Sequence, residues 1–67
     1  MNKELLRSIM ALHGETNRDL AELLDITEQS VSGKINENNT EFKQGEIAKI
    51  RNQYGLTAEQ VTNIFFS

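Results

Sequence analysis

The residues best suited to chemistry lie on one short segment, Glu28–Ile35. Val31 and Ile35 are four residues apart, so a helix over this segment would bury both on one face. That anchoring turns a polar face outward, made of Glu28, Gln29, Ser32 and Gly33, together with parts of Ser30 and Lys34. Carboxylate, amide and hydroxyl groups can hydrogen bond to a surface that lies against the helix. Such a small, polar face suits contact with the wall of a groove, although an ordinary solvated helix face is the alternative.

Little else in the chain could support catalysis or hold a metal. It has one histidine, His13, and no cysteine, so neither a disulfide framework nor a thiolate metal site can form. The sequence also lacks a glycine-rich phosphate loop and a nucleophile–base pair. We therefore predict no enzyme activity, no cofactor, no metal and no small-molecule substrate, and we interpret His13 as a helix-end residue.

The size and charge of the chain narrow the remaining classes. Its 67 residues fit a single domain, 1–67, and carry a net charge of −3. No apolar run approaches the roughly 20 residues of a membrane span, and the N-terminal residues lack the apolar core of a signal peptide. These features predict a cytoplasmic protein with no membrane partner. The acidic balance is unusual for a nucleic-acid-binding domain, but the local placement of charge matters more than the total.

The elements that must position the polar face are helices. Apolar residues recur at helical spacing along most of the chain, which predicts five short helices in a compact all-α domain. The apolar stripes are Leu5, Leu6, Ile9, Met10 and Leu12; Leu20, Ala21, Leu23 and Leu24; Val31 and Ile35; Ile47, Ile50 and Tyr54; and Val61, Ile64 and Phe65. The predicted boundaries are Gly14, either Thr16 or Asn17, Thr27, Gly55 and a capping box from Thr57 to Gln60. Residues 36–41 are polar and predict a loop.

The segment Asn17–Asn36 resembles the helix-turn-helix of the phage repressor and Cro family. Leu20-Ala21, Ile26-Thr27 and Val31-Ser32 match the family pattern at the right spacings. The similarity continues to Ile64-Phe65 and covers essentially the whole chain, which resembles short prophage regulators of Gram-positive bacteria. The resemblance implies a five-helix, lambda-repressor-like domain with the helix-turn-helix in its second and third helices. It also implies a DNA-binding transcriptional regulator, a repressor or Cro-like protein of a phage or prophage switch, acting at the nucleoid of a bacterial host.

The resemblance further implies roles for individual residues. The residues expected to read base edges are Glu28, Gln29, Ser32 and Gly33. The residues expected to contact the DNA backbone are Asn17, Arg18, Thr27, Ser30, Lys34, Asn36, Asn39 and Lys43. The chemistry is compatible, since glutamine can bond adenine bidentately and glutamate can accept from the cytosine amino group. The sequence departs from the family pattern at Asp25 and Glu37, where glycine is common, and at Lys43, which stands at the expected N-cap of the fourth helix.

The expected partner is double-stranded operator DNA, bound by a homodimer with recognition helices in successive major grooves about 34 Å apart. Phe65 and Phe66 are adjacent, so they cannot both point into one core. We expect one to pack and the other to lie exposed, either as part of a dimer or partner surface or in a frayed tail. An alternative function is an antirepressor that keeps the fold and binds a partner repressor protein. The acidic balance, Glu28 on the outward face and the aromatic C-terminus favour that alternative.

Overall fold

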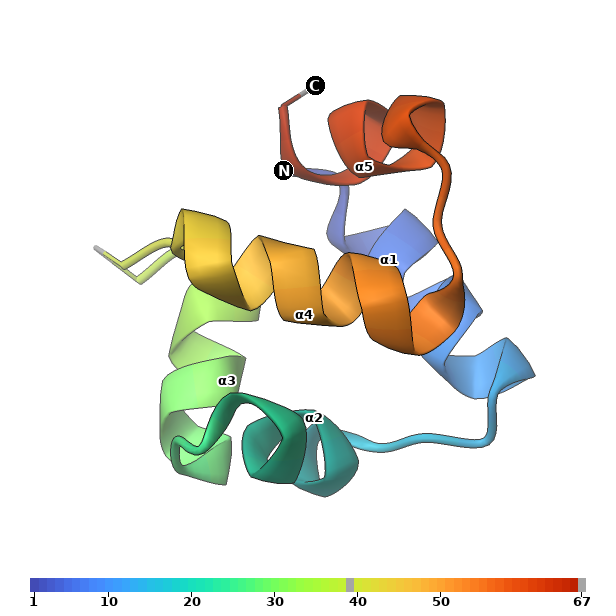
Figure 1. The fold of residues 1–67 in the computed structure, drawn as a ribbon. Coiled ribbons are helices and arrows are strands. Elements are labelled where there is room, and N and C mark those ends of the chain that lie inside the picture. The colour runs from blue at the N-terminus through green and yellow to red at the C-terminus, as the bar shows by residue number, and fades with distance from the viewer. Residues whose placement is uncertain (39, 67) are drawn as a thin grey trace.

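Five helices and no strand make up the part of the chain that the computed structural model describes, residues 1–38 and 40–66. They are α1 (Lys3–Leu12), α2 (Asn17–Leu24), α3 (Glu28–Ile35), α4 (Gln44–Tyr54) and α5 (Ala58–Phe65) (Figure 1). The prediction of an all-α domain of five short helices is therefore confirmed.

Local sequence explains where these helices begin. The Thr27 hydroxyl accepts the Ser30 N–H at 3.1 Å at the start of α3, as predicted. At the start of α5, the Thr57 N–H donates to the Gln60 side chain at 2.9 Å, and the Gln60 N–H donates to the Thr57 hydroxyl at 3.1 Å. This reciprocal pair is the predicted capping box. Of the two N-cap candidates for α2, the structure selects Thr16.

Two glycines explain where helices end. Gly14 follows α1 with φ +67°, and Gly55 follows α4 with φ +62°. Both angles lie in the left-handed region, which glycine adopts without the steric cost of a Cβ. The predicted stops after the first and fourth helices are confirmed.

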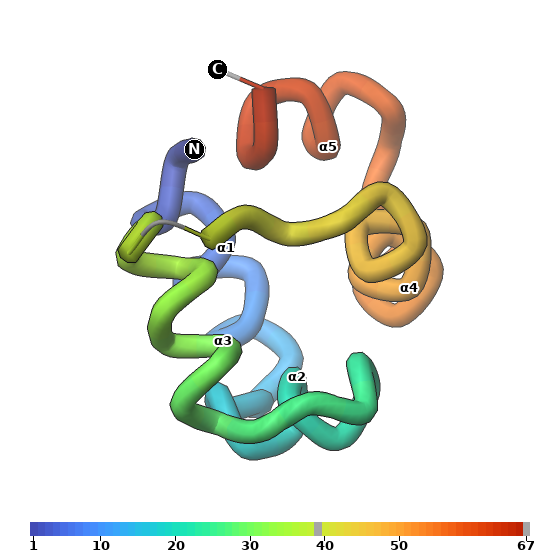
Figure 2. The backbone as a smooth tube through the Cα atoms, turned by 90° about the vertical axis from the view of Figure 1, so that its left-hand side faces the viewer, coloured from blue at the N-terminus to red at the C-terminus, as the bar shows by residue number. Residues whose placement is uncertain are grey.

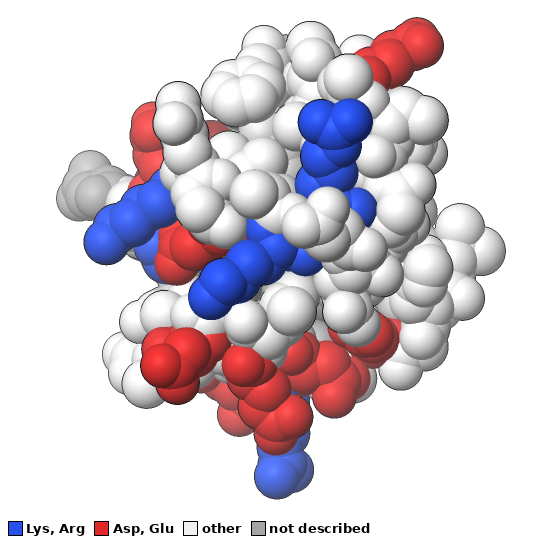
Figure 3. All heavy atoms as spheres, viewed as in Figure 1, with Lys and Arg blue, Asp and Glu red and all other residues white. Residues whose placement is uncertain are grey.

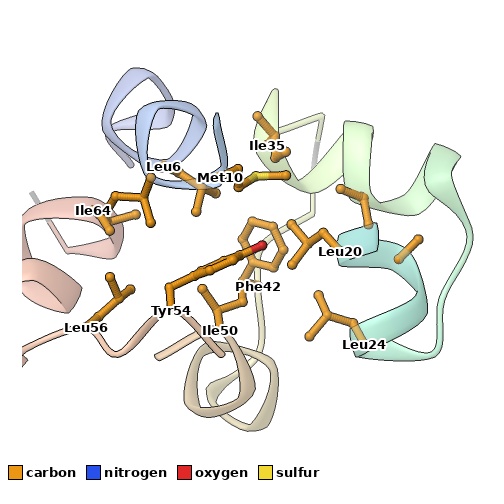
Figure 4. Packing of buried hydrophobic residues seen from close by; sticks show 13 residues of the cluster. Leu6, Met10, Leu20, Leu24, Ile35, Phe42, Ile50, Tyr54, Leu56 and Ile64 are labelled. Atoms are coloured by element: carbon orange, nitrogen blue, oxygen red, sulfur yellow. The ribbon is translucent and has the colours of Figure 1, made fainter. Parts of the chain in front are cut away.

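The core gathers apolar side chains from all five helices (Figure 4). The fully buried side chains are Leu6, Leu20, Val31, Ile35, Ile50 and Ile64. One of the sequence interpretations was wrong: Leu12, assigned to the core stripe of the first helix, is 85% exposed. Phe42, in the segment before α4, belongs to none of the predicted stripes and is buried.

The α2–α3 pair and α5 lie at opposite ends of the molecule, with α4 between them (Figures 1 and 2). The N-terminus lies beside α5, where the Asn2 N–H donates to the Ile64 carbonyl at 2.7 Å. The start of α3 therefore lies away from α5, whereas Lys34 near the end of α3 lines a cavity together with Phe65. None of the described helices is long and apolar enough to cross a lipid bilayer.

Candidate nucleic-acid interface

The position of α3 is fixed by its inward face and by the turn that precedes it. Val31 and Ile35 are fully buried, and the small side chain of Ala21 is buried in α2, which packs against α3. The connecting turn is short because Asp25 ends α2 in the left-handed conformation, with φ 56° and ψ 45°. The Ile26 N–H then returns to the Ala21 carbonyl at 3.0 Å. The predicted anchoring of α3 is confirmed, and Asp25 takes the left-handed conformation that glycine adopts readily.

The residues predicted to read base edges lie on the side of α3 away from Val31 and Ile35, and their side chains differ in exposure. Glu28 and Gln29 are exposed, and Ser32 is half-buried. Gly33 is also half-buried, and a Cβ built on it would meet the Thr40 methyl group at 3.6 Å, an ordinary contact distance. Gly33 therefore borders the loop after α3, whereas Glu28 and Gln29 lie free at its first turn.

The predicted backbone contacts around the start of α2 and α3 lie at the surface. Asn17 is half-buried in the first turn of α2, next to the exposed Arg18. The Arg18 guanidinium lies 3.7 Å from the Glu22 carboxylate, and such an exposed pair contributes little, so the guanidinium can exchange partners. The exposed Thr27 hydroxyl donates to the Ser30 hydroxyl at 3.0 Å.

Lys34 does not lie where the sequence interpretation placed it. Its side chain is about nine-tenths buried between α3 and α4, and its Nζ lies 3.1 Å from Glu46 Oε1. The same Nζ donates to the Glu41 carbonyl at 3.1 Å. The expectation that Lys34 points partly outward was wrong because the aliphatic stem follows Val31 into the interior, three residues along the same face.

Hydrogen bonds and the neighbouring lysines keep Glu46, the partner of Lys34, ionised. Burial alone raises the pKa of this carboxyl group, but hydrogen bonds from the Lys43 backbone N–H and from Lys34, together with the lysine charges, lower it. The net pKa lies below the ordinary value of 4.5. Glu46 is therefore ionised at neutral pH and carries the charge that Lys34 requires.

The remaining predicted backbone contacts follow α3. Asn36 is the C-cap of α3, and its Nδ2 lies 3.4 Å from the Ser32 hydroxyl. Lys43 is the predicted N-cap of α4, with an exposed side chain and a backbone N–H that donates to Glu46 Oε1 at 2.8 Å. Asn39 lies outside the described residues. Glu37 takes the left-handed conformation that a loop glycine would adopt, with φ 56°.

An open depression separates the beginning of α3 from the beginning of α4. Thr27 and Ser30 line one side of it, and Thr40 and Lys43 line the other. The backbone N–H groups at the start of a helix carry partial positive charge, so the first turns of α3 and of α4 each favour an anion. Among the described residues, no group of three or more His, Cys, Asp or Glu side chains could hold a metal ion.

Charge is distributed unevenly over the surface. In the view of Figure 3, acidic side chains gather at the bottom, over α2, and basic ones lie across the middle, around α4. The exposed acids near the start of α3 are Glu22, Asp25 and Glu28, and the exposed bases of α4 and its N-cap are Lys43, Lys49 and Arg51. Acidic side chains therefore surround the start of α3, and of these bases only Lys43 lines the depression beside α3.

The two C-terminal phenylalanines divide as predicted into one that packs and one that does not. The ring of the half-buried Phe65 meets that of Phe42 edge-on, with centroids 5.7 Å apart. Phe66 is 67% exposed and borders a cavity of about 240 Å³ that Met1 and Ile47 also line. Whether a second protein covers Phe66 stays a prediction.

Sequence reasoning missed Glu46, which joins Lys34 to Lys43. A signal was present, because a glutamate three residues after an N-cap position forms half of a capping box. Comparisons of this chain with models of protein families, with characterised proteins and with solved structures found no match. Its function is therefore argued from α3 and the residues around it.

Proposed function

We propose that this chain is a sequence-specific DNA-binding regulator of transcription, with α2 and α3 as a helix-turn-helix and α3 as the recognition helix. The observation that carries the proposal is the division of α3 into two faces. Val31 and Ile35 hold it against the core, while Glu28 and Gln29 lie exposed at its first turn. In a helix-turn-helix, N-terminal residues of the recognition helix contact base edges in the major groove. Resemblance to phage repressor and Cro proteins supports the same function.

Positions around α3 suit contacts with the DNA backbone on both sides. Arg18 at the start of α2 and Lys43 at the start of α4 are exposed cations, and each lies at a helix N-terminus. Helix N-termini and hydroxyl groups bind phosphates without adding formal charge, so few lysines are needed. A homodimer would bring two such faces to the half-sites of a pseudo-palindromic operator. The phage or prophage switch and the bacterial cytoplasm follow from the resemblance alone.

A selection from random duplex DNA followed by binding titration tests the proposal. We expect enrichment of a palindrome and, because few cations face the DNA, a shallow salt dependence. Gln29→Ala should weaken specific binding by about 1–3 kcal/mol and relax specificity at one base pair. Asn63→Ala is the matched control, since it removes an exposed amide from α5. No sequence preference, or a log–log salt slope steeper than about −6, would contradict the proposal.

A second candidate function is binding to a partner repressor protein. It is favoured by the exposed Glu22, Asp25 and Glu28 around the start of α3, because these acids repel phosphates but would attract a basic protein surface. Light scattering on a mixture with the repressor encoded beside its gene distinguishes the two functions. A stable heteromer together with weak binding to DNA would favour the antirepressor role. Tight DNA binding with no heteromer would exclude it.

A further inference from the structure

Lys34 is the one charged side chain among the described residues that is buried, although it lies on the helix proposed to face DNA. Its ammonium group has two partners, Glu46 Oε1 and the Glu41 carbonyl, each at 3.1 Å. To reach a phosphate, the ammonium would have to leave both. Glu46, whose side chain is only 14% exposed, would then lose its ammonium partner and keep only the Lys43 N–H, which is unfavourable.

The two partners of Lys34 bracket the segment that leads into α4. Glu41 lies two residues before Lys43, and Glu46 Oε1 also accepts the Lys43 N–H at 2.8 Å. One carboxylate oxygen thus joins the lysine of α3 to the residue that begins α4. The exposed side chain of Lys43 is thereby held at a set place relative to α3.

Packing along the same segment reinforces this link. Phe42 is buried and meets Phe65, so the segment is held from the core side. The Thr40 methyl group lies 3.6 Å from the position that a Cβ on Gly33 would take, so the segment also runs close along α3. Among the described residues, the buried Lys34 makes the polar connection between α3 and this segment.

We propose that Lys34 is a positioning residue that fixes the start of α4 against the recognition helix, and that it makes no contact with DNA. The inference rests on the proposed function, because it assigns Lys43 the phosphate contact and Lys34 the geometry of that contact. Through the Lys34–Glu46 pair, the base-reading face of α3 and the backbone contact at α4 act as one rigid unit. Losing the pair should therefore reduce sequence-specific binding more than non-specific binding.

The principal test is the double variant Lys34→Met/Glu46→Gln. It removes one positive and one negative charge, so the net charge of −3 is unchanged. Glutamine can still accept the Lys43 N–H, because a capping box takes either residue. Replacing both members of a buried pair avoids an unpaired charge, so we expect the variant to fold, which circular dichroism checks. Lys43→Met is the matched comparison, and Lys49→Met, elsewhere on α4, controls for the loss of one charge.

The measurements are specific and non-specific affinities across a series of salt concentrations. For the double variant we expect specific affinity to fall by about fivefold or more, the size of one well-placed base contact, with non-specific affinity and salt slope unchanged. For Lys43→Met we expect both affinities to fall and the slope to decrease by about 0.9 per phosphate. A slope decrease of that size in the double variant would show a direct phosphate contact and overturn the inference. Unchanged specific affinity would also overturn it.

The single variant Glu46→Gln provides an independent test. It makes the protein less acidic and weakens the hold on the Lys34 ammonium, so a phosphate-binding Lys34 would bind DNA more tightly. A positioning role predicts the opposite, a fall in specific affinity despite the more favourable charge. If the wild-type protein binds DNA with no sequence preference, the proposed function fails and the role of Lys34 fails with it. If only the variants behave otherwise than expected, the proposed function stands.

Discussion

Asp25 offers a sharp test of the turn that joins α2 to α3. It has φ 56° and ψ 45°, which is unfavourable for a residue with a Cβ by about 1–2 kcal/mol, somewhat less for aspartate, and not at all for glycine. Glycine also loses more backbone conformational entropy on folding, which costs about 0.5–1 kcal/mol relative to alanine. We therefore expect Asp25→Gly to stabilise the protein by about 0.5–1 kcal/mol and Asp25→Ala to destabilise it by a similar amount.

Thermal unfolding followed by circular dichroism measures this order. In a domain of this size, about 1 kcal/mol shifts the melting temperature by roughly 4–8 °C. The glycine variant should therefore melt about 2–8 °C above the wild type, and the alanine variant about as far below it. Asp25→Asn is the control for charge, because asparagine tolerates the same backbone conformation without a carboxylate.

Each outcome has a distinct meaning. If Asp25→Ala melts as high as Asp25→Gly, the left-handed conformation does not limit stability and the reasoning fails. If the melting temperature of Asp25→Asn rises as far as that of Asp25→Gly, the gain comes from removing repulsion with neighbouring acids such as Glu22 and Glu28. Backbone conformation would then not be its cause. Under the proposed function, both the glycine and asparagine variants should also bind DNA more tightly, since each removes a negative charge near α3.

Three further predictions concern the core and its charged groups. Because the pKa of Glu46 is lower folded than its ordinary 4.5, its stabilisation is complete above about pH 4.5 and is lost as pH falls through the folded value. In urea unfolding at a series of acid pH values, the free energy of unfolding of Glu46→Gln should therefore depend less on pH than that of the wild type. An equal pH dependence in the two proteins would contradict this. Burial first, and then the Glu15 carboxylate 3.0 Å from the hydroxyl, raise the pKa of Tyr54, the only tyrosine. Stability should fall as pH rises above about 10, and absorbance titration should show the phenol ionising above its ordinary range. Ile50→Ala should cost about 2–5 kcal/mol and leave little folded protein, whereas Leu12→Ala should change stability by less than about 0.5 kcal/mol, and equal losses in thermal melts would refute the burial assignment.

Local chemistry made the helix boundaries predictable. Thr27, Thr57, Gly14 and Gly55 act within a few residues of their own positions, so the sequence contains the partners they need. The α3 anchors were predictable for the same reason, because helical spacing alone puts Val31 and Ile35 on one face.

Tertiary packing decided the features that the sequence left open. At about 100° per residue, Leu12 lies about 60° around α1 from Ile9 but about 120° from Leu6 and 160° from Met10. It is also the last residue of the helix, so no later turn of α1 covers it. Lys34 is buried because a carboxylate from α4 meets it, and Phe42 is buried because α5 supplies Phe65. None of these partners is close in sequence. The face of α3 could thus be predicted, but not which of its polar residues are committed to the interior.

The division of α3 into two faces separates foldability from the choice of target. Val31, Lys34 and Ile35 attach the helix, while the side chains of Glu28 and Gln29 make no hydrogen bond to the described parts of the protein. New side chains at positions 28 and 29 would therefore leave the core unchanged. A library randomised at these two positions should yield mostly folded proteins, and lineages descended from such a domain could diverge in the DNA they recognise while retaining one scaffold.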